Sequence, residues 1–484
     1  MAKKINLFQY LLLALILILG LRLRLYKIEN PIGDWHSWRQ ADTASVGRYF
    51  YQHGINLLTP IYDDRSSLPS GKPNPQGYRM VEFPIYNALH AIVAWQQWWN
   101  FDQSGRMLSV FSSLLAIICL WGVVRLLSGT LTAFVAAFIL AVLPFGLYYS
   151  RVILPDPLMT FLWLLGTWLF LNAWFKPKIG GISFWGSAVV FSISLLVRPY
   201  FGFFLIPLAA WWIACFGKNF YKQKSVYLYA AIVLLPFIAW RLWVRQFPEG
   251  IPAQGFLFNY SNIRFSQAWF RWIFGERLGR LILGFWGLVP LCLGLLAKPT
   301  KRENWFYHLW FLGVLLYFVV FAGGNVMHDY YQAITIPILA VLLAKGIVFA
   351  FTPKRDFVWP VLPILVTFST LMMLGMSWYQ IREYYNINNW SMVRAGQAAD
   401  KILPANALVV APYQGDTAFL YQINRPGYPL VESDDIKNMI DVRHVTHYVS
   451  LNQDAITNQV LREPEFKVLE QTPEYVIVQL REAK

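Results

Sequence analysis

The chain has 484 residues, of which 57% are hydrophobic, 17% are aromatic and only 14% are charged. A soluble protein of this length carries roughly a quarter charged residues, so the composition excludes an ordinary soluble enzyme. The net charge of +15 does not require a nucleic-acid partner, because Lys and Arg fall mostly in short clusters between apolar runs, as in the cytoplasmic loops of membrane proteins.

Apolar runs of about 20 residues, enough to cross a hydrocarbon core of roughly 30 Å, recur along the chain. We predict a polytopic α-helical membrane protein, because backbone in lipid must satisfy its own hydrogen bonds. The first run follows Lys3 and Lys4 and lacks a small-residue cleavage site, so we expect an uncleaved span. The runs lie near 5–21, 83–99, 107–127, 130–150, 157–175, 182–197, 200–216, 226–243, 281–297, 305–322, 332–350 and 357–378.

The run at 83–99 differs from the others, because it contains Asn and Gln side chains and a histidine and ends in a Trp pair. Such a mixture is typical of an amphipathic helix that lies in the membrane interface. If it does not cross and the N-terminus is cytoplasmic, four basic clusters all become cytoplasmic, as the positive-inside rule requires. This interpretation predicts eleven spans and an extracytoplasmic C-terminus. The clusters are 176–178, 217–224, 298–302 and 352–355.

The same topology collects polar residues from distant parts of the chain on the outer membrane face. These residues lie in the 22–106 segment and at the mouths of later spans. We therefore predict that they meet in one pocket, although they are far apart in sequence. The set comprises Asp34, Asp42, Glu82, Asp156, Arg198, His328 and Asp329.

The stretch DWHSWRQADTASVGRYFYQHG follows the first apolar run. Ser37 and Gln40 fit a capping box, so we predict a helix with Ser37 as its N-cap that ends near Gly54. Asp42 lies on this helix, and Asp34 lies just before it. Such a density of polar side chains beside a span favours a functional site over a solvated interfacial helix.

Other polar groups stand at predicted span ends. Asp156 lies between two prolines, where an Asp commonly caps a helix, and Glu82 precedes a helix in the same way. A carboxylate at a span mouth can also hold a metal ion or orient a substrate. Arg198 ends a span; it either snorkels to the interface or clamps a phosphate, for which its planar fork is suited. The segment MHDYYQ places a His-Asp pair at another span mouth.

The composition changes after about residue 385, where long apolar runs stop and acidic residues become frequent. The pattern predicts a helix over 391–403 and strands over 407–413, 445–451 and 475–480. We therefore predict two domains, a transmembrane domain over 1–384 and a small α/β extracytoplasmic domain over 385–484.

The predicted residues suit sugar transfer from a lipid phosphate to a hydroxyl group. A carboxylate would accept the proton of the acceptor, and Arg, His or a divalent ion would stabilise the departing phosphate. No nucleotide-binding motif is present, so a lipid-linked donor is favoured over a nucleotide-linked one.

The stretches HSWRQADTASVGRYFY, EFPIYNALHAI, YYSRVILPDPLMTFLWL and HDYYQAITIPILA are similar to segments of one family. Over nearly its whole length the chain resembles the GT-C membrane glycosyltransferases, as a bacterial relative of the protein O-mannosyltransferases and of the lipid A aminoarabinose transferase. The resemblance implies a GT-C fold in the bacterial inner membrane, with two interfacial helices in the first outer loop. It also implies inverting transfer from a polyprenyl-phosphate-linked sugar to a glycan, lipid or protein acceptor.

The resemblance makes a carboxylate of the first outer loop the general base. In this sequence Arg39 and Gln40 occupy the usual family position. The candidates are therefore Asp42, which lies within the signature and is favoured, and Asp34.

By the same resemblance, Glu82 and Asp156 help to bind a divalent metal ion or orient donor and acceptor, and no other cofactor is expected. Further residues are expected to bind the substrate or its phosphate. They are His36, Arg39, Arg198, His328, Asp329 and Tyr331.

The alternative function is a secondary transporter or flippase of lipid-linked sugars. Such proteins place ionisable groups near the bilayer midplane and often show internal repeats. Here the acids cluster at outer span ends and no repeat is seen, so an enzyme is favoured. A noncatalytic scaffold would leave the crowded first loop unexplained.

Overall fold

The computed structural model describes residues 7–175, 181–352, 361–432 and 435–482. The basic positions Lys3 and Lys4, the cluster at 176–178 and residues 353–355 lie outside these ranges. The chain divides into two compact units. Unit 1 comprises Met1–Ile28, Met107–Arg241 and Gln254–Glu383, and unit 2 comprises Glu29–Arg106, Leu242–Ala253 and Tyr384–Lys484.

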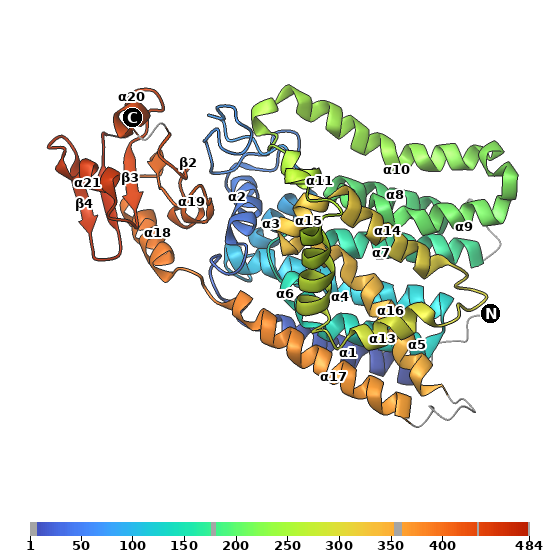
Figure 1. Cartoon of the computed structure of the whole chain (residues 1–484). Coiled ribbons are helices and arrows are strands. Elements are labelled where there is room, and N and C mark those ends of the chain that lie inside the picture. The colour runs from blue at the N-terminus through green and yellow to red at the C-terminus, as the bar shows by residue number, and fades with distance from the viewer. Residues whose placement is uncertain (1–6, 176–180, 353–360, 433–434, 483–484) are drawn as a thin grey trace. The chain divides into compact units, whose positions relative to one another are not determined.

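Unit 1 is helical (Figure 1). Its longer helices are α1 (Leu7–Arg24), α4 (Phe101–Leu127), α5 (Thr130–Val142), α7 (Asp156–Phe175), α8 (Ile182–Val197), α9 (Ile206–Phe216), α10 (Lys224–Trp243), α13 (Leu288–Leu296), α14 (Phe306–Val320), α16 (Ile336–Phe351) and α17 (Val361–Ile381). Shorter elements join them: α6 (Pro144–Tyr149), η1 (Pro199–Leu205), η2 (Gly217–Lys222), α11 (Gly255–Asn259), η5 (Tyr260–Asn262), α12 (Gln267–Phe270), the π-helix η6 (Arg271–Ile282), α15 (Ala322–Met327) and η7 (Asp329–Thr335).

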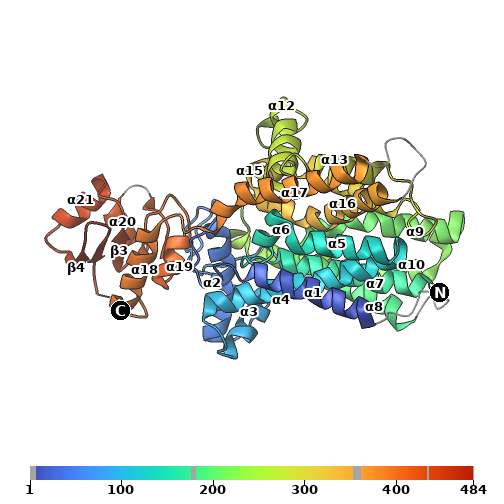
Figure 2. The ribbon, with the colours of Figure 1, turned by 90° about the horizontal axis from the view of Figure 1, so that it is seen from below.

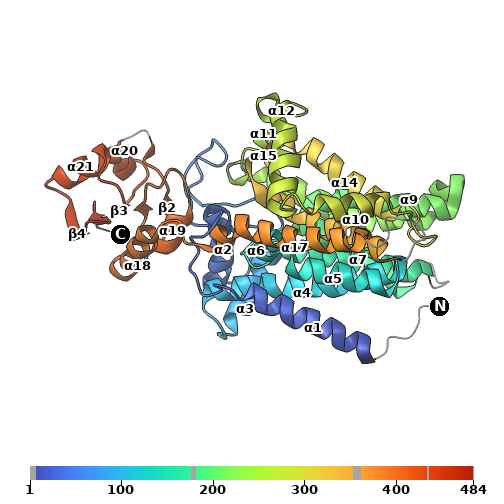
Figure 3. The same ribbon diagram turned by 60° about the horizontal axis from the view of Figure 1, so that its bottom comes forward.

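Seven helical segments within the described residues are long and apolar enough to cross a membrane. Unit 1 holds three shorter apolar helices as well, namely α5, α8 and α14. A multi-pass membrane protein is therefore confirmed, whereas the count of eleven spans stays a prediction. In all three views the beginning of α1 and the turn between α9 and α10 lie at the same end of unit 1 (Figures 1, 2 and 3).

Two glycines let α13 and α16 pack backbone against backbone. A Cβ atom on Gly294 would lie 1.8 Å from the carbonyl oxygen of Leu342, and one on Gly346 would lie 1.8 Å from that of Pro290. Small residues at such contacts are the usual means by which membrane helices approach closely. Substitution of either glycine would therefore force these helices apart.

Unit 2 contains the first outer segment and the tail. Its elements are α2 (Ser37–His53), α3 (Ile85–Trp95), η3 (Val244–Gln246), η4 (Pro248–Gly250), α18 (Trp390–Ile402), β1 (Val409–Val410), α19 (Ala418–Ile423), β2 (Gly427–Tyr428), α20 (Ile436–Asp441), β3 (His447–Ser450), α21 (Ala455–Arg462), β4 (Lys467–Gln471) and β5 (Val476–Gln479), with η8 (Arg382–Tyr385) at its border.

The helix α3 is much shorter than the apolar run that predicted it. Its 11 residues rise about 17 Å, too little to cross a hydrocarbon core of about 30 Å. It packs against α2 through a small core around Phe50 and Ala91. The expectation that this segment does not cross agrees with its length, while its interfacial position stays a prediction.

The tail forms a five-stranded sheet with the order β2-β1-β3-β5-β4. β1 pairs in parallel with β2 and β3, and β5 pairs antiparallel with β3 and β4. Apolar side chains including Val410, Tyr448 and Val478 form its core. The predicted helix and all three predicted strands are present, and β2 and β4 are additional.

Backbone hydrogen bonds join the first outer segment to the edge of this sheet. The N–H of Arg65 donates to the carbonyl of Gly427 at 2.8 Å, and the N–H of Gly427 donates to the carbonyl of Asp63 at 2.9 Å. The β2 edge is thereby covered, as exposed sheet edges usually are. The predicted domain boundary at residue 385 stays a prediction, because the structure groups the tail with 29–106 in one unit.

Candidate functional site

The start of α2 differs from the predicted capping box. The N-cap position is held by His36 in a left-handed conformation (φ 56°), without a side-chain cap bond, and Ser37 is already helical. The Gln40 amide instead donates to Asp34 Oδ1 at 2.7 Å and to the carbonyl of Trp35 at 3.2 Å. The capping-box prediction is wrong because a buried carboxylate competes for the Gln40 side chain, whereas the predicted helix end before Gly54 is confirmed.

Asp34 is fully buried and lies between two donors. Besides the Gln40 amide, Arg106 Nη1 approaches its Oδ2 at 3.3 Å, and both side chains of this ion pair are inaccessible to solvent. A carboxylate can be buried at moderate cost only with such partners. The geometry holds this candidate base rigidly at the beginning of α2.

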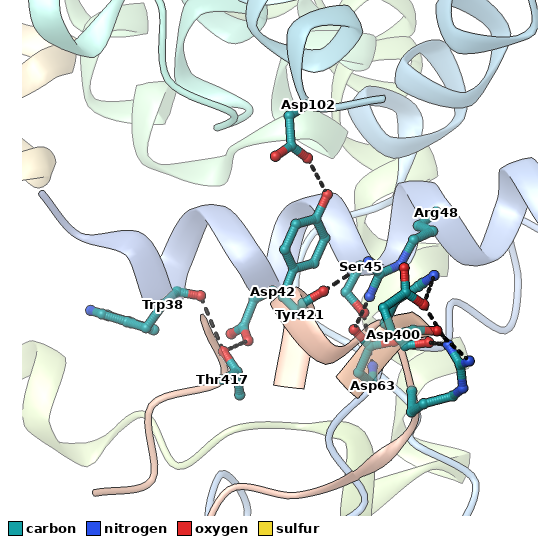
Figure 4. Close-up of polar contacts among 11 residues, drawn as sticks. Trp38, Asp42, Ser45, Arg48, Asp63, Asp102, Asp400, Thr417 and Tyr421 are labelled. Carbon is teal, nitrogen blue, oxygen red and sulfur yellow. Dashed lines mark hydrogen bonds and ion pairs between the residues drawn. The ribbon is translucent and has the colours of Figure 1, made fainter. Parts of the chain in front are cut away.

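Asp42 is held by contacts from two other parts of the chain, of which Figure 4 shows the one from Thr417. Arg79 Nη2 lies 2.6 Å from Asp42 Oδ2, and the Thr417 hydroxyl donates to Asp42 Oδ1 at 2.7 Å. The same hydroxyl lies 3.3 Å from the carbonyl of Trp38. Both carboxylate oxygens thus accept charged or hydroxyl donors, which fixes the orientation of the other candidate base.

The negative charge of Asp42 helps to raise the pKa of two further carboxyl groups, those of Asp64 and Asp416. Burial raises the pKa of Asp64 to about 6, hydrogen bonds from Ser66 oppose this, and the negative charge of Asp42 adds to it. Burial likewise raises the pKa of Asp416 to about 6, opposed by the N–H of Ala418 and reinforced by Asp42. Unlike a carboxyl in water, these two groups titrate close to neutral pH.

Arg39 and Glu82 form an ion pair with a 2.7 Å contact, and both side chains are largely buried. Within the described residues no group of three or more His, Cys, Asp or Glu side chains is placed to hold a metal ion. Glu82 pairs with Arg39 and Asp156 pairs with Arg198. The role of Glu82 and Asp156 as metal ligands stays a prediction.

A second network on α2 was not predicted from the sequence (Figure 4). Arg48 pairs with Asp63 at 2.6 Å and donates to the carbonyl of Tyr421 at 2.9 Å, and its guanidinium lies 4.2 Å from the centre of the Tyr421 ring. The Tyr421 hydroxyl donates to Asp102 at 2.5 Å. Through Thr417 and Tyr421, the short helix α19 and the residue before it therefore connect the tail to α2.

In unit 1 the predicted residues gather where α7, α8 and η7 meet. Arg198 follows α8 and lies 3.3 Å from Asp156 at the start of α7. Its guanidinium lies 5.0 Å from the ring centre of Tyr200 and 5.8 Å from that of Tyr331. The ring of His328 is 6.4 Å from that of Tyr331. Carboxylate, cation and aromatic rings thus form one cluster.

Asp329 is placed by another aromatic residue. The Tyr149 hydroxyl, on α6, donates to Asp329 Oδ1 at 2.6 Å. Tyr149 and Asp156 both line a cavity of about 50 Å³, larger than the ~30 Å³ that one water occupies in the liquid. A small, mostly apolar cavity with a few polar groups therefore lies beside the ion pair.

The ten predicted site residues divide equally between the two units. Each unit brings its own members into ion pairs, hydrogen bonds or ring contacts. The meeting of the seven residues that the topology brings to one membrane face in a single pocket stays a prediction. Unit 2 holds Asp34, His36, Arg39, Asp42 and Glu82, and unit 1 holds Asp156, Arg198, His328, Asp329 and Tyr331.

Residues 99–243 match the family model of the dolichyl-phosphate-mannose-protein mannosyltransferases. Among solved structures, ArnT from Cupriavidus metallidurans bound to undecaprenyl phosphate is 12% identical with a TM-score of 0.68, and 97% of each chain is covered. The Archaeoglobus fulgidus oligosaccharyltransferase tethered with an acceptor peptide is 12% identical with a TM-score of 0.61, covering 92% of this chain and 69% of that one. The arabinofuranosyltransferase AftD from Mycobacteria is 13% identical with a TM-score of 0.61, covering 97% and 40%. No curated protein matches the sequence.

The fold is therefore that of a multi-pass GT-C membrane protein with a small sheet in its tail. The resemblance to the GT-C membrane glycosyltransferases is confirmed by the family match and by the fold shared with ArnT over 97% of both chains. At these identities the solved structures show the fold alone.

Proposed function

We propose that this protein is an inverting glycosyltransferase that moves a sugar from a polyprenyl-phosphate donor to a hydroxyl acceptor on a lipid, glycan or protein. The reaction takes place on the extracytoplasmic face of the bacterial inner membrane. The family match over residues 99–243 and the fold shared with ArnT, whose structure contains undecaprenyl phosphate, support this proposal.

The observation that carries the proposal is the position of Arg198. It lies within the matched segment and pairs with Asp156, which the segment also contains. A guanidinium presents N–H donors in a plane that matches phosphate oxygens. The guanidinium carbon also lies 5.0 Å from the ring centre of Tyr200 and 5.8 Å from that of Tyr331, so aromatic rings add to the stabilisation of its charge. Arg198 would stabilise the phosphate charge that develops as the sugar leaves.

The base in this mechanism is Asp42, with Asp34 as the alternative. The carboxylate accepts the proton of the acceptor hydroxyl while that oxygen attacks the anomeric carbon. The carbon–oxygen bond to the donor phosphate breaks on the opposite side, which inverts the configuration. Thr417 and Arg79 hold Asp42 in one orientation and so limit the motion that would otherwise slow proton transfer.

The test is to reconstitute the purified full chain in nanodiscs with a panel of radiolabelled polyprenyl-phosphate sugars and extracted cell-envelope acceptors. We expect one donor to yield a labelled product of inverted configuration, and we expect Arg198→Lys to lower its formation about 10²–10³-fold. In sealed vesicles, movement of the donor across the bilayer with no product would instead establish the transporter alternative and overturn the proposal.

A further inference from the structure

A large apolar cavity lies in unit 1 among α7, α8, α9 and α10. Its volume is about 240 Å³, well above the roughly 150 Å³ of an engineered protein cavity that binds benzene. Every side chain around it is apolar or aromatic, including those of Phe170, Trp212 and Phe220. The hydroxyl of Tyr229 is already hydrogen-bonded to Ser187 at 2.7 Å. The cavity therefore suits a hydrocarbon chain better than a polar ligand.

Three lysines flank this cavity, two in the turn between α9 and α10 and one at the first residue of α10. This turn lies at the same end of unit 1 as the beginning of α1 (Figures 1, 2 and 3). Lys218 and Lys222 stand on either side of the lining residue Phe220, and Lys224 precedes the lining residue Val226 by two positions. All three lysines are exposed, and none forms an ion pair with a carboxylate in the described part of the chain.

The sequence around the cavity offers these lysines no partner of opposite charge. No Asp or Glu occurs between Pro157 and Pro248, a stretch that contains α8, α9, α10 and all of α7 after its first residue, Asp156. Basic residues are also enriched on the cytoplasmic side of membrane proteins, next to a leaflet with anionic lipids. The outer side of α10 is exposed at Tyr227 and Leu235, as expected for a surface in contact with lipid.

We propose that this cavity and turn bind one anionic phospholipid of the cytoplasmic leaflet, with an acyl chain in the cavity and the phosphate near the three lysines. The site is separate from the cluster around Arg198 and does not depend on sugar transfer. A tightly held lipid would fill a space that otherwise leaves the aromatic walls without packing partners.

Native mass spectrometry of the full chain in detergent tests this inference with phosphatidylglycerol and phosphatidylethanolamine of identical acyl chains. We expect at least a fivefold preference for phosphatidylglycerol, since each lysine near a membrane surface contributes on the order of fivefold to binding of anionic lipid. The triple variant Lys218→Gln/Lys222→Gln/Lys224→Gln should lose that preference. The cavity-filling variant Ala230→Phe should lower binding of both lipids at least fivefold.

A matched control removes the same charge from another turn of unit 1. In the variant Lys298→Gln/Lys301→Gln/Arg302→Gln, phosphatidylglycerol binding should stay within twofold of the unmodified chain. Equal loss in both triple variants would show a general charge effect and overturn the proposal. Phosphatidylglycerol binding that persists in both the lysine variant and the cavity variant would overturn the proposal as well. Complete displacement of phosphatidylglycerol by equimolar undecaprenyl phosphate would also overturn it.

Discussion

The buried charges of the two units are satisfied in different ways. In unit 2 the candidate base Asp42 receives two short contacts, 2.6 Å from Arg79 and 2.7 Å from Thr417. In unit 1 Arg198 lies 3.3 Å from Asp156, and rings of tyrosines lie against its guanidinium. The first arrangement immobilises an anion with hydrogen bonds, and the second supports a cation with ring faces.

The two arrangements suit two different catalytic tasks, proton transfer in unit 2 and phosphate binding in unit 1. A general base must present one oxygen in a fixed direction, for which short bonds from several segments are effective. A phosphate-binding arginine must present a planar set of donors to its ligand, and contacts with aromatic rings add to the stabilisation of its charge. If these roles are assigned correctly, substitutions of the candidate bases in unit 2 slow proton transfer, and substitutions around Arg198 weaken the stabilisation of the donor phosphate.

The largest effect is expected from the candidate bases. Asp42→Asn should lower kcat about 10²–10⁴-fold, the usual contribution of a general base, while the amide keeps the hydrogen bond from Thr417 and the fold. Asp34→Asn should have the same effect if it is the base instead. The measurement is product formation by each variant and by the double variant, with thermal unfolding as the control. Full activity in the double variant would remove both residues from the mechanism.

The next effect concerns the cation. Arg198→Lys keeps the charge but loses the planar fork, and we expect an activity loss of about 10²–10³-fold, as for removal of one donor to a developing anion. Arg394→Lys provides a comparison, because that arginine pairs with Glu474 on the surface of unit 2 and should change activity by less than twofold. Similar losses in the two variants would contradict a special role for Arg198.

A smaller effect concerns pH. Since the folded state raises the pKa of Asp64 from 3.8 to about 6, the folded state binds a proton more readily than the unfolded state. Stability should therefore fall as the pH rises from about 4 to about 6, by at most about 3 kcal/mol from this group. Asp64→Asn should flatten that part of the profile in thermal unfolding measured from pH 4 to pH 8. An unchanged difference between variant and unmodified chain over this range would contradict the assignment.

Much of the fold could be predicted from periodicity. The helix predicted over 391–403 is α18 (Trp390–Ile402), and the three predicted strands are β1, β3 and β5. The missed strand β2 has two residues and exists because its backbone pairs with β1 and with the loop at 63–65. The missed strand β4 is mostly exposed and lacks an apolar pattern. Such elements depend on partners that local sequence does not reveal.

The site was predictable in its residue types but not in its pairs. The sequence pattern correctly predicted that Asp42 lies on the helix that is α2 and that Arg198 lies at the end of the helix that is α8. It could not show that Thr417, 375 residues away, would reach Asp42, or that Gln40 would turn to Asp34 instead of capping the helix. These contacts are decided by tertiary packing, since a hydroxyl or amide has many local partners of similar energy.

The smallest effect is expected from Thr417, because its substitution changes a contact of the candidate base and leaves the carboxylate itself in place. Thr417→Val removes the hydroxyl that donates to Asp42 and keeps the shape of the side chain. A hydrogen bond to a charged group contributes about 1.5–3 kcal/mol, so melting should shift down and kcat should fall about tenfold with little change in KM. Thr417→Ser restores the donor and should recover most of both. If Val and Ser variants lose activity equally, the methyl packing and not the hydrogen bond is responsible. If neither loses activity while melting shifts, Thr417 only joins the tail to α2, and Asp34 becomes the better candidate for the base.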